Sequence, residues 1–430
     1  MEQLVSLAKR RGFIYPGSDI YGGLAGTYDY GPLGVVLKNN IKKSWIEKFV
    51  GTREDMYLMD AAILMNPQVW QATGHADHFS DPMVECIKCK KRYRTDQLDG
   101  TTCPSCGGAF GPERQFNMML ETKMGAVEDS ASVTYLRPET AQGMFVNFKN
   151  VVDTMAPKMP FGMAQIGKAF RNEITPRDFI FRVREFEQME IEYFVHPDEW
   201  ERYFNYWKDE MMEWIESIGI DMNRLHDVEI GPDDRAHYSA RTVDFEFDYP
   251  FGQKELYGLA YRGDYDLTKH ATASKQKLQY TDQEKNETFV PHVIEPSFGL
   301  DRTVLAILLS AYTVDTVNDE ERTYLNLPAH IAPFQMAVSP LLKNKPELTD
   351  VARRVFRTLK DTFHNVAWDD NGNIGKRYRR QDEIGTPYCV VIDFETLDDG
   401  MVSVRDRNTT EQTRIAIDDL VQHFINVLTQ

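Results

Sequence analysis

The sequence has 430 residues, of which 42% are hydrophobic and 27% charged, and a formal net charge of −17. This length and composition are typical of a globular protein of about two to four domains. No stretch approaches the roughly 20 apolar residues of a membrane span, and the opening MEQLVSLAKRRGF lacks the apolar run of a signal peptide. We therefore expect a cytoplasmic protein with no membrane partner. The negative charge disfavours nonspecific binding to nucleic acid, which needs exposed Lys and Arg.

The first part of the chain predicts a helix followed by a strand. Pro32 suits the first turn of a helix, and apolar residues recur after it at helical spacing: Leu33, Val36, Leu37, Ile41, Trp45 and Phe49. The segment MYLMDAAILM (56–65) then predicts a strand that ends at Asn66-Pro67. We interpret the glycines of YGGLAGTYDYGPLG (21–34) as turns, because no Gly-Lys-Ser/Thr follows them as a phosphate loop requires.

Four of the five cysteines form two Cys-x-x-Cys pairs, Cys86/Cys89 and Cys103/Cys106, separated by 13 residues. Two such pairs can supply four thiolates to one tetrahedral zinc ion, so the spacing predicts a zinc ribbon rather than disulfides. The fifth, Cys389, lies in the apolar run TPYCVVIDF and is expected to be a buried strand residue. The histidines of GHADHF (74–79) are interpreted as structural rather than metal-binding.

Residues 164–194, AQIGKAFRNEITPRDFIFRVREFEQMEIEYF, predict a β-hairpin with a chemically unusual face. Side chains alternate along a strand, which places one set together on the return strand: Arg182, Arg184, Phe186, Gln188 and Glu190. Arginine can bind a phosphate, an aromatic ring can cover a base, and carboxylates can bind a cation or an amine. The alternative is an exposed sheet face with cross-strand charge pairs.

Three other stretches carry polar residues in suggestive positions. RPETAQG puts Glu139 at the start of an amphipathic helix, where the helix dipole alone could favour an acid. EPSFGLDR predicts a strand, a glycine turn and a helix with Arg302 in its first turn. A cation there is unfavourable for the helix and would suit phosphates gathered at that helix start. Between the cysteine pairs, KKRYRTDQL contains Arg94 in what is otherwise a solvated basic run.

After the polar, proline-containing segment 319–330, strands and helices are expected to alternate in a small sheet with helices. From Leu327 to the end there are 13 basic and 15 acidic residues, so this part is nearly neutral although the chain is acidic. It contains the cluster Lys376, Arg377, Arg379 and Arg380. Such a cluster suits contact with nucleic acid, and a solvated loop is the alternative.

Several motifs together resemble one enzyme family. FRNE followed by RVREFEQME is similar to motif 2 of class II aminoacyl-tRNA synthetases, in the version of the dimeric glycyl-tRNA synthetases. RPETAQG and EPSFGLDR resemble that family's amino-acid pocket and motif 3, and the early helix–strand–proline pattern resembles motif 1, which builds its dimer interface. IGKRYRRQDEIGTP resembles its anticodon-binding domain. One departure is Tyr261-Arg262-Gly263-Asp264, where the family usually has Asn-Arg-Thr/Ser-Asp.

The resemblance implies an α+β fold, with an antiparallel sheet core and flanking helices, a zinc-ribbon insertion and a C-terminal α/β anticodon-binding domain. The implied boundaries are 1–84 for the first part of the catalytic domain, 85–110 for the insertion, 111–325 for the second part and 327–430 for the anticodon-binding domain. The implied activity is ATP-dependent ligation of glycine to tRNA(Gly) through a glycyl-adenylate, in a homodimer that uses Mg²⁺ and structural Zn²⁺. The alternatives are a class II synthetase for another small amino acid and a non-catalytic nucleic-acid-binding relative.

The resemblance also implies, residue by residue, an ATP-binding set. Arg171 is assigned to the α-phosphate, Arg302 to the γ-phosphate, Arg182 to the phosphate tail, Phe186 to adenine and Glu255 to magnesium. The full set is Arg171, Asn172, Glu173, Phe181, Arg182, Val183, Arg184, Glu185, Phe186, Glu255, Leu256, Gly299, Leu300, Asp301 and Arg302.

A second implied set binds glycine. Glu139 and Glu190 suit the ammonium group, either Arg262 or Arg94 suits the carboxylate, and Ser297 is expected near Cα. The full set is Arg94, Glu139, Phe186, Glu187, Gln188, Met189, Glu190, Arg262, Glu295, Pro296, Ser297, Phe298 and Gly299. The implied zinc ligands are the four paired cysteines.

Overall fold

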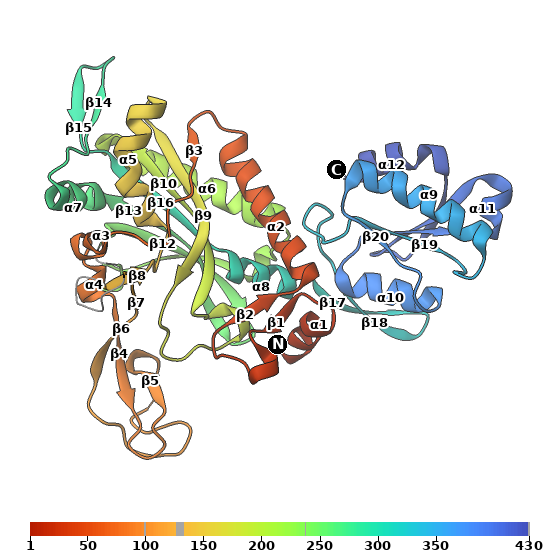
Figure 1. Cartoon of the computed structure of the whole chain (residues 1–430), viewed down its shortest axis with the longest axis horizontal. Coiled ribbons are helices and arrows are strands. Elements are labelled where there is room, and N and C mark those ends of the chain that lie inside the picture. Colours follow the sequence, from red (N-terminus) through yellow and green to blue (C-terminus); the bar gives the residue numbers. More distant parts are fainter. Residues whose placement is uncertain (99, 126–132, 237, 429–430) are drawn as a thin grey trace.

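The computed structural model describes residues 1–98, 100–125, 133–236 and 238–428. A large part is built on a seven-stranded sheet, and a smaller C-terminal part lies beside it (Figure 1). The segment that carries β4 (Ser80–Glu85) and β5 (Arg92–Arg94) projects from the large part. Within these described ranges, no helix has the length and apolar character needed to cross a bilayer.

The central sheet has the order β11-β12-β13-β16-β10-β9-β3. Every neighbouring pair is antiparallel except β3 and β9. Its strands are β3 (Met56–Leu58), β9 (Phe161–Phe170), β10 (Glu185–Val195), β11 (Leu225–Glu229), β12 (Arg241–Tyr249), β13 (Gly252–Gly263) and β16 (His292–Gly299). The observed core is therefore the antiparallel sheet that the sequence predicts.

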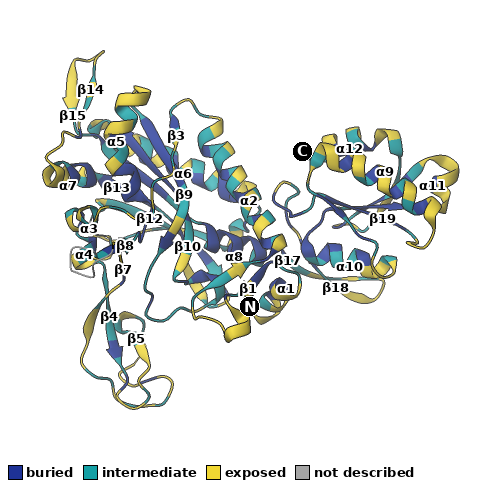
Figure 2. Ribbon diagram, in the orientation of Figure 1, coloured by how far each residue is buried: buried dark blue, intermediate teal, exposed yellow. Residues whose placement is uncertain are grey.

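Helices cover both faces of this sheet. On one face, α2 (Pro32–Ile46), α6 (Trp200–Ser217) and α8 (Leu300–Ala311) bury a core that includes three fully enclosed tryptophans, Trp45, Trp207 and Trp214. On the other face, α5 (Ala141–Met155) and α7 (Tyr265–Ser274) build a smaller core around phenylalanines of β9 and β10. Figure 2 shows the buried residues along the strands and on the inward sides of the helices.

Shorter elements surround this core. The projecting segment is a three-stranded sheet with the order β5-β4-β6. The remaining elements of the large part are α1 (Glu2–Arg10), β1 (Ile14–Pro16), β2 (Tyr28–Tyr30), α3 (Pro67–Ala72), α4 (His75–His78), β6 (Arg114–Asn117), β7 (Leu120–Lys123), β8 (Val133–Leu136), β14 (Tyr280–Asp282), β15 (Glu287–Phe289), β17 (Tyr312–Val317) and β18 (Glu320–Leu325).

Two expected strands are shorter in the structure. The strand predicted over 56–65 ends at Leu58, and Ala61 O accepts a hydrogen bond from a buried arginine side chain, Arg137 Nη1, at 2.7 Å. The return strand of the hairpin begins at Glu185, so Arg182 and Arg184 lie in the connecting loop and the predicted alternation does not extend to them. The backbone N–H of Arg184 donates instead to Gly26 O at 2.8 Å, in a distant turn.

The C-terminal part is a five-stranded sheet with the order β20-β19-β21-β22-β23, parallel at its first two pairings and antiparallel at the others. Cys389 is 5% exposed on the central strand, which confirms its prediction as a buried strand residue. The elements are β19 (Met336–Pro340), α9 (Pro346–Phe363), β20 (Val366–Trp368), α10 (Ile374–Ile384), β21 (Tyr388–Ile392), α11 (Phe394–Asp399), β22 (Met401–Asp406), β23 (Gln412–Ala416) and α12 (Leu420–Leu428).

The basic cluster expected in this part is mostly engaged inside the protein. Arg377 is buried and donates to backbone carbonyls, among them Gly372 O at 2.9 Å. Arg380 Nε donates to Asp369 Oδ2 at 2.8 Å, and Arg379 Nη1 donates to a carbonyl of β18 at 3.1 Å. Of the four side chains only Lys376 is exposed. Arg377 is therefore unavailable as a surface cation, and the alternative of a solvated loop is wrong because all four residues lie on α10. Contact of this helix with nucleic acid stays a prediction.

Candidate active site

A cavity of about 320 Å³ opens on the polar face of the central sheet, beside the start of α8. Backbone pairing brings distant segments together here, since Gln188 and Glu190 of β10 lie opposite Gly299 and Ser297 of β16. Seventeen of the residues assigned from the sequence line the cavity: Glu139, Arg171, Glu173, Phe181, Arg182, Val183, Phe186, Glu187, Gln188, Glu190, Glu255, Leu256, Glu295, Ser297, Gly299, Asp301 and Arg302.

The other assigned residues lie near the cavity or away from it, but do not line it. Met189, Phe298 and Leu300 belong to the hydrophobic core on the opposite face of the sheet. Arg184 donates to backbone carbonyls of the adjoining loops, and Glu185 pairs with a lysine across the hairpin. The nine residues outside the lining are Arg94, Asn172, Arg184, Glu185, Met189, Arg262, Pro296, Phe298 and Leu300.

Arg171, at the end of β9, is held in a fixed orientation. Its guanidinium lies between two aromatic rings, 5.3 Å from the centroid of Phe79 and 5.2 Å from that of Phe186. Its Nε donates to Pro138 O at 3.1 Å. A planar cation stacked in this way is oriented before any ligand binds, and its remaining N–H groups are free to reach an anion in the cavity.

Two more arginines lie at the same end of the cavity. Arg302 Nη1 is 3.1 Å from Glu255 Oε2, and its guanidinium stacks over Phe181 at 4.5 Å. Arg182 Nη1 lies 3.4 Å from Glu173 Oε2. The cavity thus has one end lined by three arginines, which suits a polyphosphate.

A pair of carboxylates lies at this end as well. Burial opposes ionisation of Glu255, but Arg302 lowers its pKa. Burial, followed by repulsion from Glu255, raises the pKa of Asp244 to about 7. Asp244 was not predicted as a site residue. Its signal was present in VDFEFDY, where period-two alternation puts Asp244, Glu246 and Asp248 on one face of β12.

Asp301, beside Arg302, fixes the start of α8. Its carboxylate accepts from Tyr30 Oη at 2.5 Å and from the backbone N–H of Glu187 at 2.8 Å. Lys38 of α2 lies 2.8 Å from Glu187 Oε2 and lowers the pKa of that carboxyl against the opposing effect of burial. Residues 30–38, strand β10 and the start of α8 are thereby joined.

The opposite end of the cavity is acidic and almost fully buried. Glu190 Oε2 accepts from Thr140 Oγ1 at 2.5 Å, and its Oε1 accepts from Ser297 Oγ at 2.8 Å. Burial, and then repulsion from Glu139, raises the pKa of Glu190. Burial raises the pKa of Glu295 to about 8 although Arg262 opposes this. Carboxylates that gather in a closed space are suited to a small cation such as an ammonium group.

Arg262 is enclosed, and each of its three side-chain nitrogens donates to a carboxylate. Its Nε and Nη2 donate to both oxygens of Asp266, at 2.7 and 2.8 Å, and Nη1 donates to Glu295 at 2.8 Å. Glu192 of β10 is fully buried, and neither of its carboxylate oxygens has a hydrogen-bond partner among the described residues. Burial, followed by repulsion from Glu295, raises its pKa well above the ordinary range.

Arg94 lies on β5 in the projecting segment. It pairs with Asp81 at 2.6 Å and with Asp96 at 2.7 Å. The segment also contacts the loop of the hairpin, because Thr175 Oγ1 donates to Arg92 O at 3.2 Å. Arg94 is thus engaged by two carboxylates and stands at the base of the segment rather than in the cavity lining.

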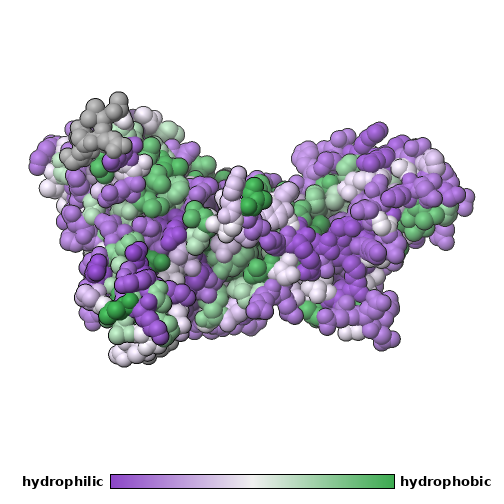
Figure 3. Space-filling view, turned by 60° about the horizontal axis from the view of Figure 1, so that its bottom comes forward, coloured by the Kyte–Doolittle hydropathy of each residue, from purple (hydrophilic) through white to green (hydrophobic). Residues whose placement is uncertain are grey.

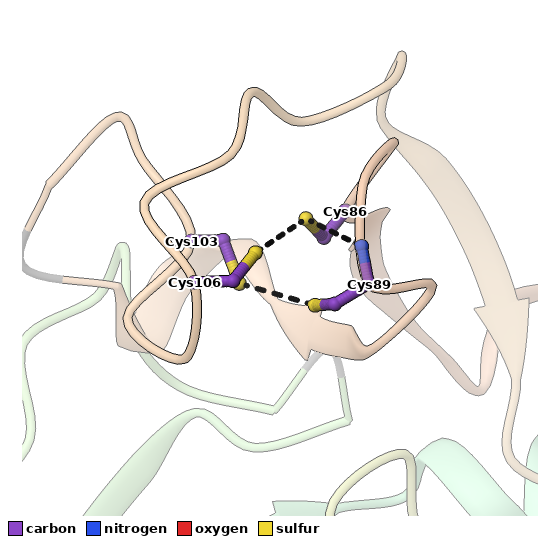
Figure 4. A group of neighbouring side chains, drawn as sticks. All are labelled: Cys86, Cys89, Cys103 and Cys106. Atoms are coloured by element: carbon purple, nitrogen blue, oxygen red, sulfur yellow. Dashed lines mark hydrogen bonds between the residues drawn. The ribbon is translucent and has the colours of Figure 1, made fainter.

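The four paired cysteines converge in the projecting segment (Figure 4). All are free thiols, and their sulfur atoms lie within 4.8 Å of one another. Cys86 Sγ is 3.5 Å from Cys106 Sγ, and Cys89 Sγ is 3.6 Å from Cys103 Sγ. Sulfurs of a tetrahedral zinc site with Zn–S bonds of about 2.3 Å are about 3.8 Å apart. Where the structure is described, the only other group spaced to hold a metal is Glu190, Glu192 and Glu295, so GHADHF is not part of one.

Comparison with known proteins identifies the two parts. The family description "tRNA synthetase class II core domain (G, H, P, S and T)" matches residues 126–311, and "Anticodon binding domain" matches residues 335–426. A glycine–tRNA ligase of Geobacillus thermodenitrificans is 49% identical over 98% of this chain and 96% of its own length. One of Borreliella burgdorferi is 50% identical over 99% of this chain and 96% of its own length.

The chain belongs to the glycine–tRNA ligase family. It is a class II synthetase that joins glycine to tRNA(Gly), and its C-terminal part is the anticodon-binding domain. A solved prolyl-tRNA synthetase of Cryptosporidium parvum superposes with a TM-score of 0.70 at 14% identity, over 99% of this chain and 76% of that one. At that identity the likeness concerns the fold, which it extends over both parts of the ligase.

Proposed function

We propose that this cavity is where the ligase forms glycyl-adenylate from glycine and ATP. The observation that carries the proposal is the charge separation within one enclosure, with Arg171, Arg182 and Arg302 at one end and buried carboxylates at the other. A triphosphate and an ammonium group need opposite charges, and glycine is small enough to keep its carboxylate between them. The reaction joins two anions, so positive charge held ready at the phosphorus lowers the barrier.

At the ATP end, we assign Arg171 to the α-phosphate, Arg302 to the γ-phosphate, Arg182 to the phosphate tail and Phe186 to adenine. The stacking of Arg171 supports this, because a preorganised donor does not have to reorient as charge develops. Catalysis in such phosphoryl chemistry rests on positioning and charge, and no nucleophilic side chain is required.

Magnesium would be held at this end by Glu255 and Asp244. The raised pKa of Asp244 supports this assignment. Repulsion between the carboxylates of Asp244 and Glu255 would be relieved by a cation bound to both. Mg²⁺ binds through one or two carboxylates plus phosphate oxygens, and when bound it neutralises phosphate charge.

At the glycine end, Glu139 and Glu190 would hold the ammonium group, with Ser297 close to Cα. One added methyl group is usually worth about 1–3 kcal/mol of binding, so rejection of alanine has to come from steric contact with packed walls. Arg262 supports the pocket by holding Glu295 in place. Arg262 and Arg94 remain our two alternatives for the glycine carboxylate, and each needs to exchange a present carboxylate partner to reach it.

The insertion at 85–110 is proposed to bind structural zinc through Cys86, Cys89, Cys103 and Cys106. The four convergent free thiols support this, and when bound the metal would supply folding energy rather than chemistry. We keep the other boundaries as 1–84 and 111–325 for the catalytic domain and 327–430 for the anticodon-binding domain.

A cytoplasmic homodimer is proposed as the working form. Large hydrophobic side chains are exposed on the N-terminal segment and on motif 1: Ile20 at 89%, Tyr21 at 87%, Leu24 at 61%, Val35 at 44% and Leu58 at 50%. Apolar side chains in such numbers are typical of a surface covered by a partner. Figure 3 shows the C-terminal domain, by contrast, with a mostly hydrophilic surface.

The test of the cavity is glycine-dependent ATP–pyrophosphate exchange with matched variants at its two ends. Glu190→Gln should raise KM for glycine with KM for ATP nearly unchanged, and Arg302→Ala should raise KM for ATP more than KM for glycine. Alanine and serine should support little exchange. Should both variants affect the two substrates equally, or should alanine exceed glycine, the assignment of the cavity fails.

A further inference from the structure

His75, the first residue of α4, lies next to the glycine end of the cavity. Its side chain is 3% exposed, yet each ring nitrogen has a polar partner. Nε2 lies 3.3 Å from Glu139 Oε2, and Nδ1 lies 2.7 Å from Thr73 Oγ1. The rings of Trp70 and Phe79 flank the imidazole, with centroids 5.5 and 5.7 Å away. Glu139 lines the cavity and His75 does not, so the direct polar route from His75 to a ligand passes through Glu139.

These partners determine where the ring carries hydrogen. Ionised Glu139 can only accept, so Nε2 donates to it. When the imidazole is neutral, Thr73 Oγ1 can donate to Nδ1. When the imidazole is charged, Nδ1 donates to Thr73, whose hydroxyl can turn to Val69 O at 3.0 Å. In either protonation state an N–H of His75 faces Glu139.

The orientation of Glu139 depends on few other groups. Its Oε1 accepts from Gln142 Nε2 at 3.0 Å, and Gln142 is itself held by Asp266 and His270. Burial opposes ionisation of Glu139, but His75 and then Arg262 lower its pKa well below the ordinary range. With one donor on each oxygen, the carboxylate stays ionised and keeps its remaining lone pairs for the cavity.

We propose that His75 is a positioning residue for glycine, which donates from Nε2 to Glu139 and holds that carboxylate toward the ammonium group. The inference rests on the proposed function, since it is there that Glu139 receives the ammonium. A histidine that served folding alone would act equally in the presence or absence of the Glu139 charge. A positioning histidine acts on glycine only through the charged carboxylate of Glu139, so its effect should be lost when that charge is removed.

The test is a double-mutant cycle in glycine-dependent ATP–pyrophosphate exchange with the full-length enzyme. His75→Leu should raise KM for glycine about 10-fold or more, the loss expected on removing a hydrogen bond to a charged group. KM for ATP should stay within about twofold. His75→Gln retains a donor and should recover most of the loss. Glu139→Gln should itself raise KM for glycine, and adding His75→Leu to it should change that value little further.

Two results distinguish failure of the inference about His75 from failure of the proposed glycine pocket. An equal effect of His75→Leu in the wild-type and Glu139→Gln backgrounds would overturn the inference, because His75 then acts independently of Glu139. An unchanged KM for glycine in Glu139→Gln would instead reject the proposed glycine pocket. If His75→Leu does not fold, as judged by thermal melting, Thr73→Val takes its place. This variant keeps the imidazole and removes the partner of Nδ1, together with the hydroxyl's bond to Val69 O. It should give a smaller increase that is likewise absent in the Glu139→Gln background.

Discussion

Arg171 offers the sharpest test of how this ligase lowers its barrier. The guanidinium lies between Phe79 and Phe186, and its Nε donates to Pro138 O, so under the proposed assignment it would meet the α-phosphate without reorganisation. Removing one preorganised donor of this kind costs about 10²–10³ in rate, equivalent to about 2.7–4 kcal/mol. Arg171→Ala should therefore lower kcat of glycine-dependent ATP–pyrophosphate exchange by that factor.

Arg171→Lys should recover little of the loss. A lysine keeps the charge, but it has no planar group to fill the space between the two rings. Lys168→Ala is the matched control, because this basic residue of the same strand makes only an exposed pair with Glu185, worth about 0–1 kcal/mol. Exchange should be unaffected in the control, and tRNA affinity should be unaffected in all three variants. A loss of tRNA affinity in Arg171→Ala as large as its loss of rate would refute the assignment.

Three further predictions concern the metal, the buried acids and the anticodon-binding domain. Cys103→Ser should lose bound metal and melt several degrees lower, whereas purified wild type without any thiophilic metal would reject the zinc site. Glu192 has a raised pKa, so the folded state keeps a proton that the unfolded state releases near pH 4.5, and stability should fall as pH rises above that value. Glu192→Gln should flatten this slope in urea titrations, and an unchanged slope would show that Glu192 is ionised in the fold. Deleting residues 327–430 should leave the rate of pyrophosphate exchange within a few-fold of the wild-type rate, because all assigned cavity residues precede them. Charging of tRNA should fall steeply. Loss of exchange would show that the cavity depends on that domain.

The sequence predicts the long elements well and the loop of the hairpin poorly. β9 and β10 occur where the sequence predicts them, and their apolar side chains pack into the cores on both faces of the sheet. Alternation also continues through Arg182 and Arg184, and nothing local shows that the ladder has ended there. The hydrogen bond from Arg184 N to Gly26 O replaces the expected strand pairing, and that partner lies in a turn far away in the sequence.

The candidate site shows the same contrast between residues that the sequence identifies and residues that only the fold identifies. Residues within a recognisable string, such as Glu139 and Glu190, could be assigned from the sequence. Asp244 and His75 could not, because each becomes relevant only through a neighbour from another segment. His75 stood out in GHADHF as one of two histidines, but only the fold brings its ring to Glu139. A side chain that acts through a ligand-binding residue leaves no motif of its own.

The balance of charge in the glycine pocket is a property that only the fold could reveal. From the sequence, Arg262 is a free cation available to a carboxylate, and Glu192 is one more acid on a strand. In the structure Arg262 is paired with Asp266 and Glu295, so its positive charge already offsets the negative charge of these two carboxylates without a substrate. The pocket is left with more carboxyl groups than cations, so repulsion between these acids adds to burial in raising the pKa of Glu190 and Glu192. A pocket in that state gains by taking in an ammonium group.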